Sequence, residues 1–292
     1  MGFRTVVVNS RSKLEARLNS LIVRGEQERR IHISEINTLI VQSTAVSMTA
    51  ALLSELVKNS VKVIFCDEKH NPLAELLPYY GAHNTSKRYK EQLSWTDGAK
   101  GRVWQDVIRR KITEQARHLM DRGYYEQADL VISYVSDVAE GDVTNREGHA
   151  AKVYFNCLLG PGSSRNDGSF VNGCLNYGYA VLLSAFNREI VSAGYLTQLG
   201  IWHDNEFNQF NLSCDLMEPL RIAVDRTAMS LEDGDKEFKR RMANVLNYYA
   251  LIDGKRTTLD VAIRTYVRSV LHALHEDRIE LICYPEQITV DE

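Results

Sequence analysis

Cysteine is scarce in this sequence of 292 residues, and its five copies form no metal-binding pattern. They stand at positions 66, 157, 174, 214 and 283, an odd number with no Cys-x-x-Cys pair. A disulfide framework needs paired cysteines, and a zinc knuckle needs closely spaced ones. The composition therefore disfavours both kinds of small, cross-linked domain.

Long hydrophobic runs and an excess of charge are also missing. The longest mostly apolar stretch, 179–186, is far too short to span a bilayer, and the N-terminal residues show no signal-peptide core. Lys and Arg number 35 against 38 Asp and Glu, a net charge of −3, so any nucleic-acid-binding surface would have to be local. We therefore expect a cytoplasmic globular protein with no membrane segment.

Short segments rich in β-branched residues fill the first eighty positions. They predict strands at 3–8, 21–24, 30–34, 38–41, 62–65 and 72–77. One helix interrupts them, with Ser47 as the predicted N-cap.

Helical periodicity dominates from Arg88 onward. The predicted helices are 87–95, 99–120, 123–136, 144–158, 170–192, 215–230, 235–250 and 257–275. The sequence therefore predicts an α+β protein: a small β-rich domain at 1–82, a linker at 83–87, and a larger, all-α-helical catalytic domain at 88–292.

Glu147 does not fit an ordinary surface helix. Its helical neighbours at i+3, i+4, i+7 and i+11 are small or apolar, namely Ala150, Ala151, Tyr154 and Leu158. An unpaired carboxylate buried on that face costs roughly several kcal/mol, so a cation beside it is the functional interpretation. The structural alternative is a capping box between Thr144 and Glu147, which have the required spacing.

Glu218 and His203 are the other two unusual residues. Asp215 and Glu218 are three apart and face one side of a helix start, although a second capping box around Pro219 is the alternative. His203 lies in a polar, glycine-broken segment, where a plain surface histidine is the alternative. One histidine with carboxylates suits Mn²⁺ or Mg²⁺ better than structural zinc.

Positive charge beyond residue 145 is concentrated enough to form a phosphate-binding track despite the acidic total. The basic residues there are Arg146, Lys152, Arg165, Arg188, Arg221, Arg226, Arg264 and Arg268. We take Arg146, Lys152 and Arg165 as the candidate DNA-binding residues.

The ordered set of motifs resembles the CRISPR-associated spacer-acquisition integrase family, the near-universal adaptation protein, in its compact type II form. The resemblance covers essentially the whole chain. It rests on segments 33–41, 47–56, 61–67, 146–155, 175–180, 200–203 and 215–221.

This resemblance implies roles for particular residues. Glu147, His203 and Glu218 match the family's catalytic ligands for Mg²⁺ or Mn²⁺, although the last ligand is Asp in some members. Asp215 and Tyr154 match supporting positions, and Arg221 matches a basic position near the substrate phosphate.

The resemblance also implies an activity and partners. Family members insert captured foreign DNA fragments into a CRISPR repeat array by transesterification from a 3′-hydroxyl. They act as homodimers, here expected to pair through the β-rich domain, and a small adaptation protein bridges two dimers on double-stranded DNA. Other type II CRISPR proteins are further candidate partners. Two alternatives stay open: a metal-dependent nuclease that only cleaves branched or linear DNA, and a non-catalytic DNA-binding scaffold.

Overall fold

The β-branched segments at the start of the chain form two four-stranded sheets. In the first, β1 (Arg4–Val8), β5 (Ile36–Val41) and β7 (Lys62–Cys66) are parallel, and β8 (Pro72–Leu76) pairs antiparallel with β7. The second has the order β4-β3-β2-β6, formed by Glu28–His32, Ser20–Arg24, Ser12–Arg17 and Val46–Met48. The computed structural model describes residues 4–79, 84–162 and 168–289.

Helix α1 (Ala50–Lys58) completes the core of this β-rich unit. Its N-cap is Thr49, whose side chain accepts a hydrogen bond from the Leu52 backbone, so the predicted cap at Ser47 is wrong by two residues. Leu52 and Leu56 of α1 are fully buried and pack with the apolar residues of both sheets. Burial of these leucines explains why the helix forms against the strands.

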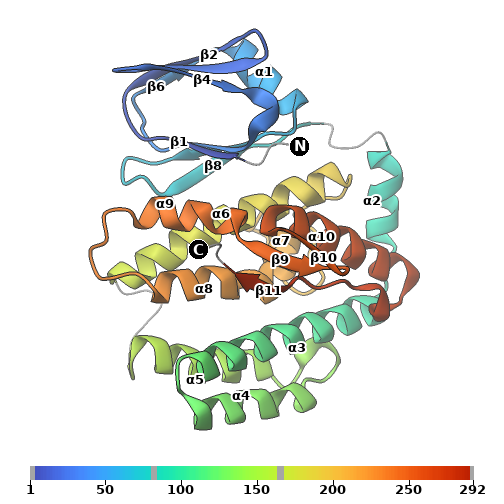
Figure 1. Ribbon diagram of the computed structural model, residues 1–292. Helices are drawn as coiled ribbons and strands as arrows, with labels where there is room; N and C mark the ends of the chain where they lie inside the picture. The colour runs from blue at the N-terminus through green and yellow to red at the C-terminus, as the bar shows by residue number, and fades with distance from the viewer. Residues whose placement is uncertain (1–3, 80–83, 163–167, 290–292) are drawn as a thin grey trace. The chain divides into compact units, whose positions relative to one another are not determined.

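The chain divides into two units, residues 1–79 and 80–292, and the second is mainly helical. A β-rich part followed by a mostly helical part confirms the predicted fold class. The second unit contains α2 (Thr85–Leu93), α3 (Asp97–Asp121), α4 (Tyr125–Asp137), α5 (Arg146–Leu159), α6 (Phe170–Ser192), α7 (Asn211–Met217), α8 (Arg221–Met229), α9 (Phe238–Ala243) and α10 (Leu259–Glu276) (Figure 1). Single-turn helices occur at Ile33–Glu35, Glu140–Asp142, Glu218–Leu220, Asn244–Asn247 and Ile279–Leu281.

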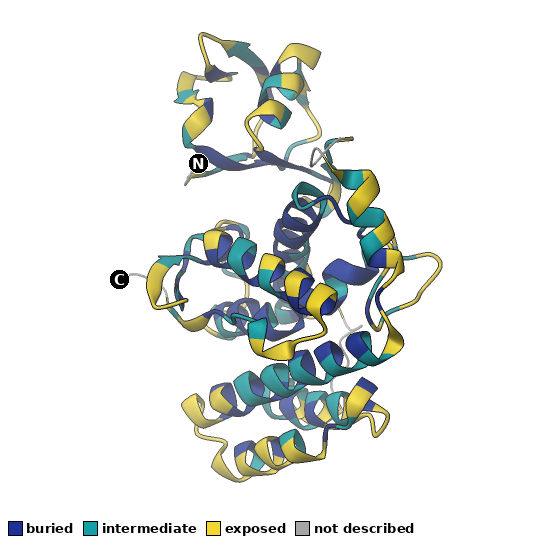
Figure 2. Cartoon of the chain, turned by 90° about the vertical axis from the view of Figure 1, so that its right-hand side faces the viewer, coloured by how far each residue is buried: buried dark blue, intermediate teal, exposed yellow. Residues whose placement is uncertain are grey.

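Two helical layers position the site. Helix α6 packs against α7, α8, α9 and α10, while α3 packs against α4 and α5 and also contacts α8 and α10. Buried residues run along most of α6 and α10, whereas α4 buries only Ala128 and Val131 (Figure 2). Helix α3 therefore connects the outer pair of helices to the buried centre of this unit.

Several predicted boundaries are wrong in the helical unit. Residues 85–87, predicted as linker, form the first turn of α2. The predicted helix over 235–250 ends early, and the following residues form β9 (Tyr249–Ile252), which pairs with β10 (Lys255–Thr258) and β11 (Glu286–Thr289). The predicted helix over 215–230 is split into α7, the turn Glu218–Leu220 and α8, since Pro219 has no N–H to continue a regular helix.

Among the helices that the structure describes, none is long and apolar enough to cross a membrane.

Candidate active site

The first turn of α5 carries Glu147, and other residues cap that turn. The Asp142 carboxylate accepts hydrogen bonds from the backbone N–H groups of Glu147, at 2.9 Å, and of the residue before it, at 2.8 Å. Asn145, in the left-handed region with a φ of 51°, caps Gly148. Thr144 instead donates its hydroxyl to a carbonyl upstream. The capping box between Thr144 and Glu147 is therefore not formed, and the Glu147 carboxylate is left for another partner.

That partner is Lys111 of α3, which lies between two carboxylates. Its Nζ is 2.6 Å from Oε1 of Glu147 and 2.6 Å from Oε2 of Glu218. The Glu218 side chain is only 5% exposed, that of Lys111 11% and that of Glu147 26%. Burial alone would raise the pKa of Glu218, but Arg221 and Lys111 bring that pKa down to about 2, so Glu218 stays ionised.

Arg221, at the start of α8, pairs with the other oxygen of Glu218. Its Nε lies 2.9 Å from Oε1 of Glu218, and its guanidinium carbon lies 4.7 Å from the centre of the Tyr179 ring. Arg221 is therefore fixed by a carboxylate and an aromatic face together. The predicted basic residue lies beside the acidic pair.

His203 is held beside these acids by Asp215. The fully buried Asp215 carboxylate accepts hydrogen bonds from the backbone N–H groups of Ile201, Trp202 and His203 and from Nδ1 of His203, at 2.5 Å. This bond raises the pKa of His203, and Glu218 and Glu147 raise it further. Because Nδ1 is engaged, Nε2 is the ring nitrogen left to bind a ligand.

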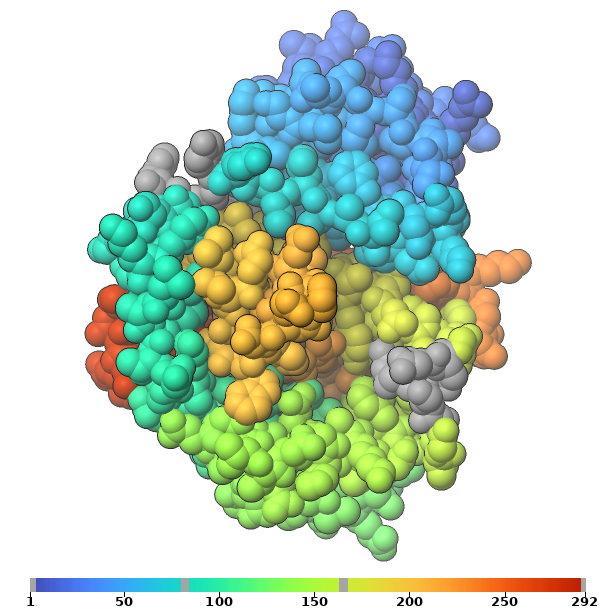
Figure 3. All heavy atoms as spheres, turned by 180° about the vertical axis from the view of Figure 1, so that it is seen from behind, coloured from blue at the N-terminus to red at the C-terminus, as the bar shows by residue number. Residues whose placement is uncertain are grey.

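The loop of His203 is tightly folded around Asp215. A Cβ on Gly200 would lie 2.7 Å from Oδ2 of Asp215, so only glycine fits there. Asp215 lies inside α7, which begins after Phe210, so the alternative of Asp215 as a helix cap is wrong. Figure 3 shows this loop (gold) at the surface, next to the teal residues of the α2 region.

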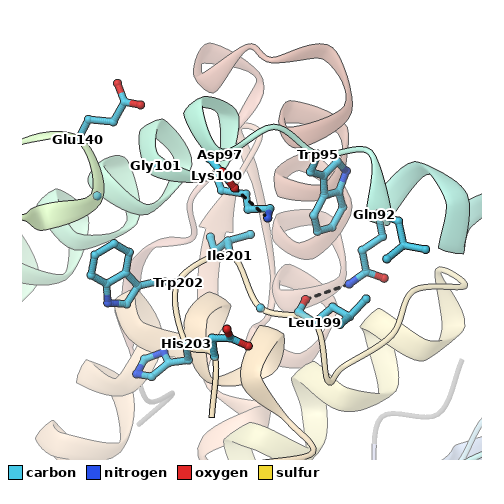
Figure 4. Close-up of a pocket in the computed structure, with 14 residues that line it drawn as sticks. Gln92, Trp95, Asp97, Lys100, Gly101, Glu140, Leu199, Ile201, Trp202 and His203 are labelled. Carbon is cyan, nitrogen blue, oxygen red and sulfur yellow. Dashed lines mark hydrogen bonds and ion pairs between the residues drawn. The ribbon is translucent and has the colours of Figure 1, made fainter. Parts of the chain in front are cut away.

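A cavity of about 530 Å³ opens beside the same loop. Trp202 and His203 lie on one side of it and Trp95, Asp97 and Lys100 on the other (Figure 4). The Trp202 ring stacks on Trp104 of α3, with ring centres 5.7 Å apart and planes 8° apart. The loop is thereby anchored to α3, the helix that also carries Lys111.

A second chain of buried polar groups lies behind the acids. Asp225 of α8 accepts hydrogen bonds from the hydroxyls of Tyr179 and Tyr154, the latter at 3.0 Å. The Tyr154 hydroxyl in turn lies 2.7 Å from Nδ1 of His118. Burial raises the pKa of Asp225 to about 6 and lowers that of His118 to about 4. Tyr154, predicted as a supporting residue, is thus fully buried and linked to α8 rather than to Glu147.

Arg146 and Lys152, two of the three candidate DNA-binding residues, both belong to α5. Arg146 pairs with Asp137 at 3.3 Å, Lys152 is exposed on α5, and Arg165 lies outside the described residues. Arg188 is unavailable for a surface track, because it is buried in ion pairs with Glu189 and Asp260. Arg264 pairs with Glu189 and is partly exposed. A track that includes Arg188 is therefore wrong.

The donor atoms of Glu147, Glu218 and His203 are of the kind that a divalent cation binds, but these side chains do not converge on one metal position in this structure. Within the described ranges, no three His, Cys, Asp or Glu side chains lie close enough to hold a metal ion. The Lys111 ammonium fills the space where Glu147 and Glu218 converge, so each carboxylate already has a cation. Two carboxylates and the Nε2 of His203 provide the mixed oxygen and nitrogen donors that Mg²⁺ and Mn²⁺ accept.

Sequence reasoning missed Lys111. Its signal lies in the inward stripe of α3, where Lys111 replaces an apolar residue at the helical spacing of Trp104, Ile108, Gln115 and His118, all four of which are buried. A lysine in such a stripe needs a buried acid as partner. Its partners are 36 and 107 residues further along the chain, since 147 − 111 = 36 and 218 − 111 = 107.

The fold and the site together define an α+β protein whose helical part pairs two glutamates with a lysine and an arginine, within electrostatic range of a histidine. The chain belongs to the Cas1 family of CRISPR-associated proteins, since the family described as CRISPR associated protein Cas1 matches residues 5–259. A curated relative from Neisseria meningitidis serogroup C (strain 8013), named CRISPR-associated endonuclease Cas1, is 31% identical over 100% of this chain and 99% of its own. A relative of the same kind from Pyrobaculum aerophilum is 24% identical over 92% of this chain and 98% of its own.

Solved structures agree with the fold. A casposase bound to an integration product has a TM-score of 0.79 and 21% identity, covering 94% of this chain and 91% of that one. A CAS1 protein from Thermotoga maritima has a TM-score of 0.69 and 15% identity, covering 99% and 100%. A Cas6-RT-Cas1–Cas2 complex matches 96% of this chain with 36% of its own, at a TM-score of 0.75 and 17% identity.

Proposed function

We propose that this protein is a divalent-metal-dependent DNA integrase that inserts captured foreign DNA into a CRISPR repeat array. The observation that carries the proposal is the pair of carboxylates, Glu147 and Glu218, held around one cation beside His203. Family membership supplies the context, because the Neisseria relative is named an endonuclease and the casposase structure holds an integration product.

Glu147, Glu218 and Nε2 of His203 are the groups that would hold Mg²⁺ or Mn²⁺. The bound ion would stabilise the charge that develops on a phosphate under attack and make a hydroxyl more acidic. Asp215 orients the imidazole of His203 through Nδ1, so that Nε2 points away from the Asp215 carboxylate. Asp215 is therefore a positioning residue, because its own oxygens already accept four hydrogen bonds.

The proposed reaction exchanges one ester bond for another. The 3′ oxygen of the captured fragment forms a bond to phosphorus in the repeat, and the bond from that phosphorus to the leaving oxygen breaks. The proton lost by the attacking hydroxyl is matched by one gained by the leaving oxygen. Because one phosphodiester bond replaces another, no outside energy source is needed. Arg221, fixed beside Glu218, supplies positive charge close to the anionic phosphate.

A complete insertion joins both ends of the fragment, so two active sites must act at a fixed separation. We propose a homodimer that pairs through the β-rich domain, where β1 and β4 are sheet edges that a second copy could cover. We also propose that a small adaptation protein bridges two such dimers. The solved Cas6-RT-Cas1–Cas2 complexes, in which Cas1 occurs with Cas2, support a partner of this kind.

A strand-transfer assay separates the proposal from its rivals. The purified protein is incubated with Mn²⁺, an end-labelled DNA fragment and a plasmid that carries the repeat. Label joined to the plasmid is the expected result. Shortened labelled DNA without joining would favour a nuclease that only cleaves, and unchanged DNA with intact binding would favour a non-catalytic scaffold.

A further inference from the structure

Lys111 occupies a position that the core of α3 would normally give to an apolar residue. Trp104 and Ile108 precede it on the same inward face, and Gln115 and His118 follow, all buried. Lysine is rarely buried unless it is paired. Lys111 has two acidic partners, each at 2.6 Å, and both belong to the proposed metal site.

The two glutamates are balanced without any metal. The positive charges of Lys111 and Arg221 offset the negative charges of Glu147 and Glu218. A divalent ion would add two positive charges next to the Lys111 ammonium. Repulsion between cations at such short range is strong in a water-poor site. The ion and the ammonium therefore compete for the same carboxylates.

The distances lead to the same conclusion. The two carboxylate oxygens each lie 2.6 Å from Nζ of Lys111, so they are no more than about 5 Å apart, twice that distance. Oxygens bound to Mg²⁺ lie only about 2.0–2.1 Å from the ion. An ion bound to both of these oxygens would therefore occupy the space that Nζ now fills.

A place for the displaced ammonium lies next to the site. A cavity of about 370 Å³ is lined by Lys111 and Glu218 together with Gln115, Tyr179, Arg221 and Asp225. Asp225 of α8, whose carboxylate accepts the hydroxyls of Tyr154 and Tyr179, is the acidic residue of this lining besides Glu218. The unbranched lysine side chain has the rotational freedom to turn from the two glutamates toward Asp225.

Building on the proposed function, we propose that Lys111 is the resident counter-ion of the metal-free site, and that a divalent cation displaces its ammonium from Glu147 and Glu218 into this cavity. Two effects of opposite sign follow. Lys111 stabilises the metal-free protein, because its positive charge lies between two neighbouring carboxylates that would otherwise repel each other. It also weakens metal binding, because the ion must break both of its ion pairs.

The test compares the wild-type protein with Lys111→Met, using Mn²⁺ alone as the probe and no DNA. Titration calorimetry gives the dissociation constant, and melting is followed in chelator and in Mn²⁺. Lys111→Met should melt at a lower temperature in chelator and bind Mn²⁺ at least about ten-fold more tightly, so its melting temperature should rise more when Mn²⁺ is added.

Two further variants make the result specific. Lys111→Arg keeps the positive charge, so it should restore the wild-type melting temperature in chelator. Arg117→Met removes a positive charge from an exposed position of the same helix and should change neither quantity. If Lys111→Met cannot be purified without metal, Lys111→Gln, which keeps a hydrogen-bond donor, is measured in its place.

The outcomes distinguish this inference from the proposed function. One outcome is that the wild-type protein binds Mn²⁺ and that Lys111→Met and Lys111→Gln bind it equally well or more weakly. This outcome would overturn the role of Lys111 and leave the integrase proposal standing. Absence of Mn²⁺ binding to every variant, the wild type included, would overturn the metal dependence on which both proposals rest.

Discussion

Asp215 illustrates how a single buried residue organises the site. Its carboxylate is fully buried and accepts three backbone N–H groups and the Nδ1 hydrogen of His203. These bonds fold the loop and set the orientation of the imidazole at once. A carboxylate used in this way has little capacity left for a metal, which separates its role from that of Glu218.

Asp225 gives a pH-dependent prediction at the residue scale. Burial raises its pKa to about 6, above the value of about 3.9 expected in the unfolded chain, so the folded protein holds its proton more tightly. The favourable contribution of Asp225 is therefore complete below about pH 4 and is lost as pH rises through about 6. Between pH 4.5 and 7.5, the stability of Asp225→Asn should rise relative to the wild type by about 2 kcal/mol.

Urea denaturation of both proteins at the two pH values measures this difference. His118 titrates in a similar range with the opposite sign, because its pKa is lowered to about 4, but both proteins contain it and its effect cancels in the comparison. A difference between the two proteins that stays constant with pH would show that Asp225 keeps an ordinary pKa.

Individual residues of the site were predictable where local spacing carried the information. The face of Glu147 was predicted as small and apolar, and Ala150 and Tyr154 are indeed fully buried. Lys111 was not predictable in the same way, because its pairing depends on elements that only the folded chain brings together. The ligand roles of Glu147, His203 and Glu218 stay predictions.

At the scale of elements, the start of α5 makes a sharp prediction. Asp142 caps two backbone N–H groups there, whereas the Thr144 hydroxyl bonds to a carbonyl outside the helix. Asp142→Ala should therefore destabilise the protein by about 2 kcal/mol, because it leaves two donors unsatisfied at the positive end of the helix. Thr144→Ala should cost less than about 0.5 kcal/mol.

Chemical denaturation gives the free energy of unfolding of the two variants. The difference between them shows whether Asp142, as observed, or the capping box of Thr144 stabilises the start of α5. The capping box would require Thr144→Ala to be the more damaging change. Equal or reversed losses would mean that α5 begins differently from the structure described above.

Helices and strands could be predicted from the sequence where local residues stabilise them, and not where distant strands do. Helix α6 has the predicted range 170–192, because Ser169 caps it and buried residues recur along most of its length. Strand β2 was missed because it is short, has only Leu14 and Ala16 as apolar residues and contains few residues that favour strands, so pairing with β3 decides its conformation. Strand β11 was missed because its partner β9 is distant in the chain. Strands β9 and β10 had a local signal, since the two-residue turn Asp253-Gly254 joins them, and the predicted helix over 235–250 overlooked it.

At the scale of the whole molecule, the net charge of −3 is acidic, whereas the proposed function requires a local basic surface that binds DNA. Each phosphate that the protein neutralises contributes about −0.9 to the slope of log affinity against log salt. The double variant Arg146→Gln and Lys152→Gln should flatten this slope by up to about 1.8, since it removes at most two phosphate contacts.

Fluorescence anisotropy with a labelled duplex, across a range of salt concentrations, gives the slope. Lys58→Gln is a matched control, because it removes one exposed charge from the β-rich unit, which contributes nothing to the predicted track. An unchanged slope in the double variant would place the DNA track on other residues.

The most direct test of the central claim is Mn²⁺-dependent strand transfer by ligand variants. Glu147→Gln, His203→Ala and Glu218→Gln should each lower the joining rate at least about 100-fold, because loss of a ligand exceeds the 10–100-fold cost of losing a supporting group. Each variant should keep the circular dichroism of the wild type, and Glu126→Gln, an exposed acid on α4, should join DNA normally. Near-normal joining by any folded ligand variant would contradict the assignment of that residue, and near-normal joining by all three would contradict the site.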